Sequence, residues 1–472
     1  MAQHFLVLTY PAQGHVNPAL HLSRRLARTT SARVTFSTSI YGHHLMFPAS
    51  AADEIVEDGL ISYLPFSDGY DDGFDSNIHC PSEACDRFRS ASSASLAALL
   101  RHLDELGRPV TCIIYNMFFG WADDVARGHG VRSAAYWIQS AAAFAIYYHY
   151  FHGYEDLIKA HSHDPLFEVN LPSLPPLKIR DLPSFLGVTS DEDPYSVVLK
   201  LFEQLFQVLD REEADSAATV LVNTFGELET ETLAVSAGKV KLIPVGPMVP
   251  PSLLEAAKDE PEFDALGDLF RPDEKKYMEW LDAKPERSVV YVSFGSLAAF
   301  KKRQTEEFVR WLRESERASL WVVRKDHEQA QGELEAALRE AGAEGMVVEW
   351  CAQGRVLSHP AVGCFVTHCG WNSTLESLVC GVPTVGVPQW TDQGTNARLM
   401  EIWGAGVRAE SDAEGVVTAE ELRRCVEIAM GGGGAAGMRR SAEMWKHKAR
   451  EAVAEGGSSD RNLRAFVAAA SQ

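Results

Sequence analysis

The sequence lacks any apolar run of the ~18 residues that a membrane-spanning helix needs. The apolar stretch at its beginning has neither a basic region before it nor a small-residue cleavage site after it, so we expect a first strand there and not a signal peptide. Positive charge is also scarce, because the sequence has 44 Lys and Arg residues against 65 Asp and Glu residues, which gives a formal net charge of −21. Binding to nucleic acid needs a basic surface, so this balance argues against such a partner. We expect a cytoplasmic protein without a membrane anchor.

Cysteine pairs spaced as Cys-x-x-Cys are absent as well. The cysteines are single, and we interpret them as free thiols of a reducing compartment. They are Cys80, Cys85, Cys112, Cys351, Cys364, Cys369, Cys380 and Cys425. Cys364, His368 and Cys369 have no second Cys or His pair at zinc-finger spacing. The run Asp191-Glu192-Asp193 fits a metal-binding DxD pattern but follows no strand, so we interpret it as a solvated surface run. We therefore expect no metal.

What the chain does have is an alternation of short apolar runs and amphipathic stretches. We expect a helix over residues 17–29, with Asn17 as N-cap and Pro18 as the first helical residue. The expected strands are His4–Tyr10, Ala32–Ser37, Thr111–Tyr115, Ser133–Ile138 and Val220–Phe225 in the first half, then Val289–Phe294, Leu320–Val323, Met346–Glu349, Cys364–Thr367 and Thr384–Val387 in the second. This alternation predicts an α/β fold with parallel sheets and helices on both faces.

Proline and acidic residues separate the two halves. The run Val245–Pro251 is rich in proline, and acidic residues follow it between positions 259 and 264. Such a composition is typical of a linker between domains. We expect a first domain over residues 1–247, a linker over 248–275 and a second domain over 276–457.

The segment from Trp350 to Gln393 carries the chemistry. An apolar run ends at His368, a turn with glycine follows, and a helix begins near Thr374. The N–H groups of a helix N-terminus bind anions, and His368, Asn372 and Ser373 add side-chain donors there. A second apolar run delivers Asp392 and Gln393, which can read hydroxyl groups. With the flat indole of Trp350, these features indicate a pocket for a nucleotide sugar.

This segment resembles the signature of the plant family 1 UDP-glycosyltransferases along its whole length. The resemblance implies the GT-B fold, two facing Rossmann-like domains, with a C-terminal helix over 458–472 that packs back on the first domain. It also implies a monomeric hexosyltransferase that inverts the sugar, transferring glucose from UDP-glucose to an oxygen of a small acceptor. UDP-glucose would be a co-substrate, and no cofactor or metal is expected.

The resemblance assigns roles to individual residues. Trp350 would stack on uracil, Gln353 would lie on the uridine side, and Glu376 would bind the ribose hydroxyls. The diphosphate would be held by His368, Asn372, Ser373 and Ser296. Trp371, Asp392 and Gln393 would read the sugar, and a terminal glutamine is associated with glucose. Gly14 and Cys351 complete the expected donor-binding set.

His15 matches the family's catalytic histidine, and a group that titrates near neutrality suits deprotonation of a hydroxyl. Family members usually support this histidine with an aspartate, but the corresponding position here holds Asn116. An amide fixes a tautomer without stabilising the imidazolium by charge. We therefore expect a weaker base, and a tilt toward acceptors that are already ionised, such as carboxylates and acidic phenols. Asp123 and Asp124 are not assumed to replace the missing carboxylate.

Two questions stay open at this point. Aromatic residues between positions 137 and 150 either line an apolar acceptor slot or form the core of a helix. They are Trp137, Phe144, Tyr147, Tyr148 and Tyr150, with Gln139 among them. The missing aspartate also leaves an alternative function, a non-catalytic protein that binds UDP-sugar or a small molecule and retains the fold.

Overall fold

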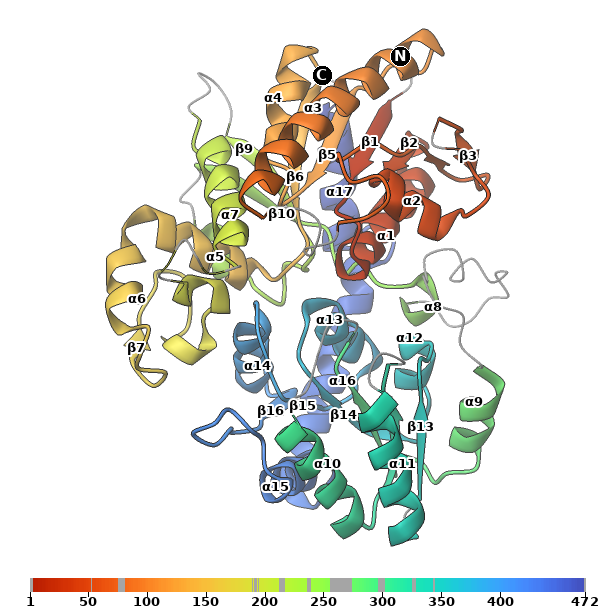
Figure 1. Ribbon diagram of the computed structural model, residues 1–472, viewed down its shortest axis with the longest axis vertical. Coiled ribbons are helices and arrows are strands. Elements are labelled where there is room, and N and C mark those ends of the chain that lie inside the picture. The colour runs from red at the N-terminus through yellow and green to blue at the C-terminus, as the bar shows by residue number, and fades with distance from the viewer. Residues whose placement is uncertain are drawn as a thin grey trace.

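The computed structural model describes residues 3–51, 53–74, 81–188, 190, 193, 195–211, 217–235, 239–254, 274–295, 302–324, 328–342 and 344–470. Each half of the chain forms one large sheet, and the two halves lie one above the other along the long axis of the molecule (Figure 1). Among the described residues of these two large sheets, neighbouring strands run parallel except for β3 and β4, an antiparallel pair at the edge of the first sheet. The expected α/β architecture with parallel sheets is confirmed.

The first sheet has eight strands in the order β10-β9-β6-β5-β1-β2-β4-β3. They are β1 (His4–Leu8), β2 (Arg33–Ser37), β3 (Val56–Glu57), β4 (Ser62–Tyr63), β5 (Cys112–Asn116), β6 (Arg132–Trp137), β9 (Ala218–Val222) and β10 (Val240–Pro244). The strand order reverses at β1, which has β2 on one side and β5 on the other. Ligands of such sheets bind beyond the carboxyl ends of the strands at the reversal.

Helices and short turns connect these strands. They are α1 (Gln13–Thr30), α2 (Ile40–Met46), α3 (Pro81–Glu105), α4 (Trp121–Gly128), α5 (Ala141–His149), η1 (Tyr150–Tyr154), α6 (Glu155–His161), η2 (Ile179–Asp181), η3 (Ser184–Gly187), α7 (Ser196–Leu209), η4 (Thr232–Ala234) and α8 (Pro251–Leu254). A small antiparallel pair, β7 (Glu168–Val169) and β8 (Leu177–Lys178), precedes η2.

The second sheet has six strands in the order β13-β12-β11-β14-β15-β16, and its reversal lies between β11 and β14. The strands are β11 (Val289–Ser293), β12 (Ala318–Val322), β13 (Gly345–Val348), β14 (Val362–Thr367), β15 (Thr384–Gly386) and β16 (Gly406–Arg408). The helices are α9 (Glu274–Asp282), α10 (Lys302–Glu314), α11 (Glu328–Ala341), α12 (Gln353–Leu357), α13 (Trp371–Cys380), α14 (Gln393–Ile402), α15 (Ala419–Met430), α16 (Gly433–Val453) and α17 (Ser458–Ala470).

Helix α1 begins four residues earlier than the sequence suggested. Its first residue is Gln13 and its N-cap is Ala12, so the expectation that Asn17 caps this helix is wrong. Pro18 lies inside the helix and not at its first position. Proline is costly there because it has no N–H to donate to the carbonyl four residues earlier, which is that of Gly14. The Gly14 carbonyl is therefore left without the donor that a regular helix supplies.

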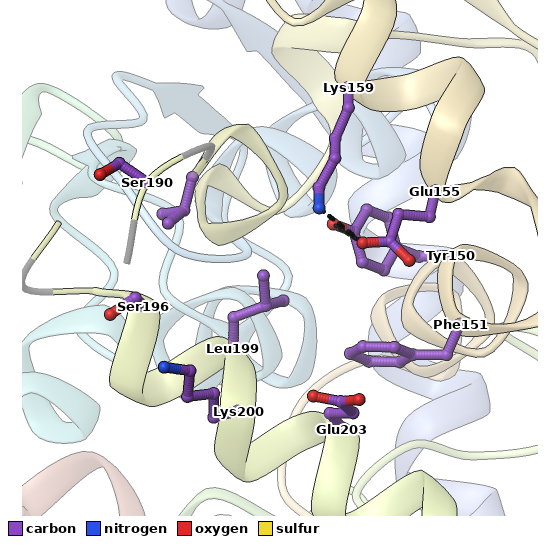
Figure 2. Close-up of a pocket in the computed structure, with 10 residues that line it drawn as sticks. Tyr150, Phe151, Glu155, Lys159, Ser190, Ser196, Leu199, Lys200 and Glu203 are labelled. Atoms are coloured by element: carbon purple, nitrogen blue, oxygen red, sulfur yellow. Dashed lines mark hydrogen bonds and ion pairs between the residues drawn. The ribbon is translucent and has the colours of Figure 1, made fainter. Parts of the chain in front are cut away.

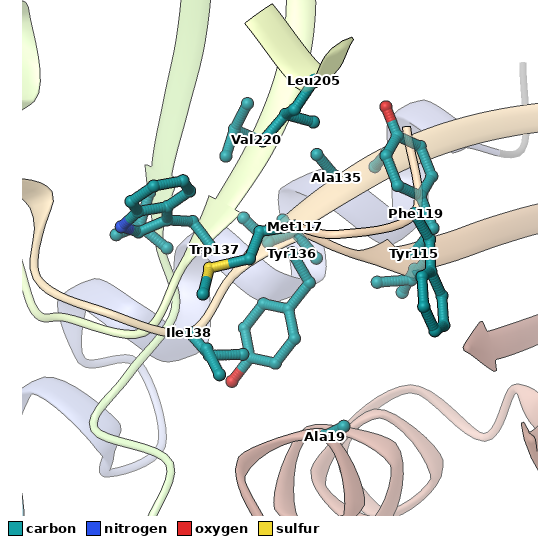
Figure 3. Packing of buried hydrophobic residues seen from close by; sticks show 14 of the residues in the cluster. Ala19, Tyr115, Met117, Phe119, Ala135, Tyr136, Trp137, Ile138, Leu205 and Val220 are labelled. Atoms are coloured by element: carbon teal, nitrogen blue, oxygen red, sulfur yellow. The ribbon is translucent and has the colours of Figure 1, made fainter. Parts of the chain in front are cut away.

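A large apolar cluster fills the first half and extends over both faces of its sheet. Figure 3 shows Tyr115, Tyr136 and Trp137 from β5 and β6 among its members. The C-terminal helix α17 joins this cluster through Leu463 and Phe466, although it follows the second half in sequence. Much of the expected linker, residues 255–273, lies outside the described residues. Within the described residues, no helix is long and apolar enough to cross a membrane.

Candidate active site

His15 lies in the first turn of α1, directly beyond the carboxyl end of β1. Asn116 is the last residue of β5, the neighbouring strand across the reversal. The two side chains meet: His15 Nδ1 lies 3.3 Å from Asn116 Oδ1 and 3.0 Å from Asn116 Nδ2. The topology of the first sheet therefore brings together the two residues predicted to be catalytic.

The two ends of the Asn116 amide have opposite consequences for the His15 ring. Asn116 Oδ1 accepts the backbone N–H of Phe118 at 3.1 Å and keeps a second lone pair. When Oδ1 also accepts from His15 Nδ1–H, the Nε2 atom carries a lone pair and can take a proton. When Nδ2 donates to Nδ1 instead, Nε2 carries the hydrogen and cannot act as a base. A carboxylate at this position would allow only the first arrangement.

The surroundings of His15 keep its ring neutral. Burial lowers its pKa to about 4, and the hydrogen bond with Asn116 opposes this shift. A neutral ring at pH 7 is what a general base requires before it accepts a proton. The rings of Tyr10 and Phe118 lie 5.4 Å and 5.0 Å from the His15 ring, so the histidine stands beside an aromatic wall.

The two aspartates of α4 are engaged elsewhere. The Asp123 carboxylate binds Arg127 and Ser133, both at 2.6 Å, and Arg211 at 3.3 Å. Asp124 pairs with Arg211 at 2.5 Å. The side chain bonded to His15 is thus that of Asn116, an amide.

The reversal in the second sheet brings the loops after β11 and β14 together. Gly295 follows β11 with a φ of 74°, and a Cβ there would lie 2.7 Å from the His368 ring after β14. Only glycine combines this backbone conformation with so close an approach. Burial lowers the pKa of His368 to about 4, so its ring offers a neutral N–H to a ligand. The N-terminus of α13 lies just beyond, with backbone N–H groups suited to an anion.

A hydrogen-bonded cluster joins the start of α12 to α13. Gln353 Nε2 donates to Ser373 Oγ at 2.9 Å and to Glu376 Oε2 at 2.6 Å. Gln353 Oε1 accepts from the hydroxyl of Tyr291 at 3.2 Å. The structure therefore brings Gln353, Ser373 and Glu376 together. The thiol of Cys351, by contrast, is buried 3.2 Å from the Tyr291 hydroxyl.

Asp392 and Gln393 stand at the start of α14, and both side chains are held. Asp392 is 5% exposed, and burial raises the pKa of its carboxyl above the ordinary value. Gln393 Oε1 accepts the backbone N–H groups of Gln389 at 2.8 Å and Trp390 at 3.1 Å. Because its oxygen is occupied in this way, the amide NH₂ of Gln393 is the group left to donate to a ligand.

One hydrogen bond links the two candidate sites across the halves. Asn372 Nδ2 donates at 3.0 Å to the carbonyl of Gly14, the group that Pro18 leaves without its helical partner. The neighbouring Trp371 faces away, because its buried indole N–H donates to the Asn223 carbonyl at 2.7 Å. The Trp371 side chain thus belongs to the packing between the halves.

Comparison with known proteins identifies the family. Residues 166–432 match the family of UDP-glucoronosyl and UDP-glucosyl transferases. The chain is 46% identical over 468 residues to UDP-glycosyltransferase 75C1 of Solanum lycopersicum, with 98% of each chain covered. It belongs to this family. The expected UDP-glycosyltransferase activity, that of a hexosyltransferase, is thereby confirmed.

Two further similarities support the assignment. The enzyme is 44% identical over 485 residues to phloretin 4′-O-glucosyltransferase of Malus domestica, covering 99% of this chain and 98% of that one. The crystal structure of Os79 from O. sativa in complex with UDP resembles it with a TM-score of 0.81 at 32% identity, covering 99% of this chain and 100% of that one. The expected GT-B fold is confirmed.

Some expectations fall outside what the structure describes. Ser296, expected at the diphosphate, and Asp191 and Glu192 of the acidic run lie outside the described residues. The seven cysteines that the structure describes are free thiols. Among the described residues, no group of three or more His, Cys, Asp or Glu side chains is arranged to hold a metal ion.

The aromatic stretch of the enzyme is mostly core. Trp137, Phe144 and Tyr147 are at most 1% exposed and pack within the first apolar cluster. Of the residues considered for an acceptor slot, Tyr150 lines a cavity of about 250 Å³ between η1, α6 and α7 (Figure 2). Lys159 also lines this cavity, paired with a glutamate on the same helix. The cavity is lined by none of the candidate donor or catalytic residues.

The sequence analysis missed Tyr10 and Phe118. Tyr10 is 38% exposed and its ring lies 5.9 Å from that of Phe118, so both flank His15. The signal was available, because the two residues follow the ends of β1 and β5, the strands at the reversal. Aromatic residues placed there are candidates to contact a planar acceptor.

Proposed function

We propose that the enzyme transfers glucose from UDP-glucose to a small lipophilic acceptor, at a phenolic hydroxyl or a carboxylate, with inversion at the anomeric carbon. The observation that carries this proposal is the placement of the neutral His15 ring, bonded to Asn116 and one residue from the Gly14–Asn372 contact with the donor half. The names of the relatives support glucose as the sugar and a phenolic oxygen as one acceptor type.

In the proposed reaction, His15 Nε2 removes the proton from an acceptor hydroxyl. The acceptor oxygen forms its bond to the anomeric carbon while the bond between that carbon and the UDP oxygen breaks. The proton ends on His15, and the electron pair leaves with UDP. A carboxylate acceptor needs no proton removal, because it is already ionised near pH 7. Tyr10 and Phe118 would flank the acceptor beside His15.

The donor would lie along the edge formed by the loops after β13, β11, β14 and β15. Trp350 would stack on uracil, with Gln353 orienting Glu376 toward the ribose hydroxyls. His368, Asn372 and Ser373, together with the N-terminus of α13 and Ser296, would hold the diphosphate. The glucose would be read by Asp392 and Gln393. The side chains of Trp371 and Cys351 are buried, so we assign both residues, with Gly14, a contribution through the backbone.

His15→Ala tests this proposal. Loss of a general base should lower kcat/KM with phenolic acceptors by roughly 10²–10⁴-fold while the affinity for UDP-glucose stays near normal. His102→Ala is the matched control, because His102 is an exposed histidine of the same half on α3. Release of UDP with a panel of phenols and carboxylic acids is the measurement. Unchanged turnover of a phenol by His15→Ala would overturn the assignment, and no UDP release from the native enzyme with any acceptor would favour a binding protein.

A further inference from the structure

The Asp392 carboxylate is held at both of its oxygens by neighbouring side chains. Thr391 Oγ1 donates to Asp392 Oδ1 at 2.8 Å, and Asn396 Nδ2 donates to Asp392 Oδ2 at 2.8 Å. A carboxylate oxygen can accept about two hydrogen bonds. Each oxygen therefore keeps capacity for a sugar hydroxyl, while the plane of the carboxylate is fixed by its two donors.

Each of these two donors is itself bound to the other half of the enzyme. The backbone of Thr391 is bonded twice to Ser184, since Thr391 N–H donates to Ser184 Oγ at 2.8 Å and Ser184 N–H donates to the Thr391 carbonyl at 2.9 Å. Asn396 Oδ1 accepts from Ser140 Oγ at 3.4 Å, and Ser140 caps the N-terminus of α5. The Asn396 amide is oriented without ambiguity, because its Nδ2 also donates to the Cys369 carbonyl at 3.0 Å.

The surrounding contact between the halves is close and polar. Arg408 binds Asp181 at 2.6 Å, with side chains only 11% and 4% exposed. Thr395 Oγ1 donates to the Asp181 carbonyl at 2.6 Å. A Cβ on Gly394 would lie 2.6 Å from the Arg180 carbonyl, so the start of α14 has no room to shift toward η2. In Figure 1, α14 lies beside the segment between β7 and α7 and below α5.

We propose that Thr391 and Asn396 are positioning residues for the donor sugar, and that Ser184 and Ser140 of the acceptor half hold them in place. The inference rests on the proposed role of Asp392 in reading glucose. According to this proposal, the acceptor half contributes to sugar recognition although Ser184 and Ser140 do not contact the sugar. Uridine and diphosphate binding would not depend on this arrangement, because Gln353, Ser373 and Glu376 lie within the donor half.

Ser184→Ala and Asn396→Ala test the proposal through the dissociation constants of UDP and UDP-glucose, measured with the whole enzyme. Ser184→Ala removes one hydrogen bond and should weaken UDP-glucose binding roughly 3–10-fold while UDP binding stays unchanged. Asn396→Ala removes the bonds to Asp392, Cys369 and Ser140 and should weaken UDP-glucose binding at least as much. Ser184 is exposed, so its variant should fold even where loss of the buried Asn396 amide does not allow folding. Ser162→Ala is the matched control, because the Ser162 hydroxyl donates to the Lys159 carbonyl away from this contact.

Asp392→Asn distinguishes a failure of the positioning inference from a failure of the proposed reading of glucose. If Asp392→Asn weakens UDP-glucose binding but Ser184→Ala leaves the ratio of the two dissociation constants unaltered, the positioning inference is overturned and the proposed reading of glucose stands. Equal loss of UDP and UDP-glucose affinity in Ser184→Ala would also overturn it, since that pattern marks a structural role. If Asp392→Asn itself changes nothing, the proposed role of Asp392 fails, and the inference fails with it.

Discussion

The strength of the proposed base, His15, would depend on a single amide. Asn116 places an oxygen and a nitrogen within 3.3 Å of the same His15 atom, and only the oxygen favours the tautomer that can accept a proton at Nε2. If His15 takes up the proton of the acceptor, as proposed, the amide also offers no charge to stabilise the imidazolium. An acceptor that is already ionised would avoid both limits, and the proposed preference for acidic acceptors rests on this reasoning.

Asn116→Asp should therefore raise kcat/KM for weakly acidic hydroxyl acceptors. A carboxylate accepts from Nδ1–H and pairs with the imidazolium, so we expect a gain of roughly tenfold, the factor that corresponds to one pKa unit. Carboxylate acceptors should gain little, because they need no base. The comparison of a phenol series with a carboxylate series checks this, and an equal loss in both classes would show that Asn116 does not limit the base.

The same residue should control the pH dependence. Burial lowers the pKa of His15 to about 4, so the native enzyme should retain kcat/KM toward phenols well below pH 6.5. Asn116→Asp adds a negative partner, which favours the protonated ring and should move the acid limb of the profile to higher pH. Profiles of kcat/KM for the native enzyme and the variant, with one phenol, provide the measurement. An acid limb that stays in place or moves down would contradict the expected contact.

The proposed role of Gln393 at the sugar can be tested in the same way. Its oxygen is occupied by the backbone N–H groups of Gln389 and Trp390, so the amide NH₂ is available to a sugar hydroxyl. Gln393→His should weaken the use of UDP-glucose by ~0.5–3 kcal/mol and shift preference toward UDP-galactose. Measured kcat/KM with both donors tests this, with the affinity for UDP as an internal control. Equal kcat/KM values in variant and native enzyme for both donors would remove Gln393 from sugar reading.

At the scale of elements, α1 lacks one backbone hydrogen bond, and the carbonyl left without a helical donor binds the facing half instead. Pro18 cannot donate to the Gly14 carbonyl, which accepts instead from Asn372 in the facing half. Pro18→Ala restores the donor within the helix. We expect a higher melting temperature, because proline inside a helix costs up to ~3 kcal/mol, together with lower kcat as the carbonyl is drawn back into α1.

The control for this prediction is a double-variant cycle. If Pro18→Ala acts through the Gly14–Asn372 bond, its effect on kcat should vanish in an Asn372→Ala background, because that bond is already absent there. The melting temperature should still rise in both backgrounds. Additive losses of kcat would mean that Pro18 affects the site by another route.

Element patterns could be predicted from the sequence where burial alone decides them. All ten expected strands exist, and most of them are continuous apolar runs that the parallel sheets bury on both faces, whereas the edge strand β13 is only partly buried. The start of α1 could not be predicted, because Gly14 and Pro18 indicate a loop. The helix includes them because Asn372 of the facing half donates to the Gly14 carbonyl. The direction of the Trp371 indole was hidden for the same reason, since its acceptor is a carbonyl 148 positions away. His15 and Asn116 could be paired by topology, whereas Ser140 and Ser184 carry no local signal at all.

For the whole molecule, the two halves meet through polar groups on both sides of the site. Arg25 donates to the Val453 carbonyl of α16 at 3.4 Å, and the Trp371 indole donates to the Asn223 carbonyl beside α13. On the far side, Arg408 binds Asp181 with both side chains nearly buried. Truncating one partner of such a buried pair costs more than the pair itself contributes, because the remaining charge stays desolvated. The relative placement of His15 and the donor site is therefore fixed by bonds that cross the halves.

Stability of the whole molecule should depend on histidines outside the site whose pKa is lowered in the native chain, and the half-buried His21 isolates the effect. Burial, together with the guanidinium groups of Arg24 and Arg28, lowers the pKa of His21 to about 3. The native chain then binds fewer protons at this residue than the unfolded chain below about pH 6.5, so its contribution to stability is present above that pH and is lost as pH falls toward 3.

The loss of stability should reach ~2 kcal/mol by pH 5. That pH lies about 1.5 units below the pKa of the unfolded histidine, which is then protonated, whereas the native histidine is still neutral. His21→Gln cannot take up a proton in either state, so its stability should not carry this loss, and the free energy of unfolding of the variant relative to the native enzyme should rise by ~2 kcal/mol between pH 8 and pH 5. Denaturant unfolding at the two pH values measures the difference, and UDP affinity at pH 8 should be equal in both proteins because His21 lies outside the site. A gap that stays constant between the two pH values would mean that the His21 ring is protonated as readily in the native chain as in the unfolded one, and that burial in α1 does not hold it neutral.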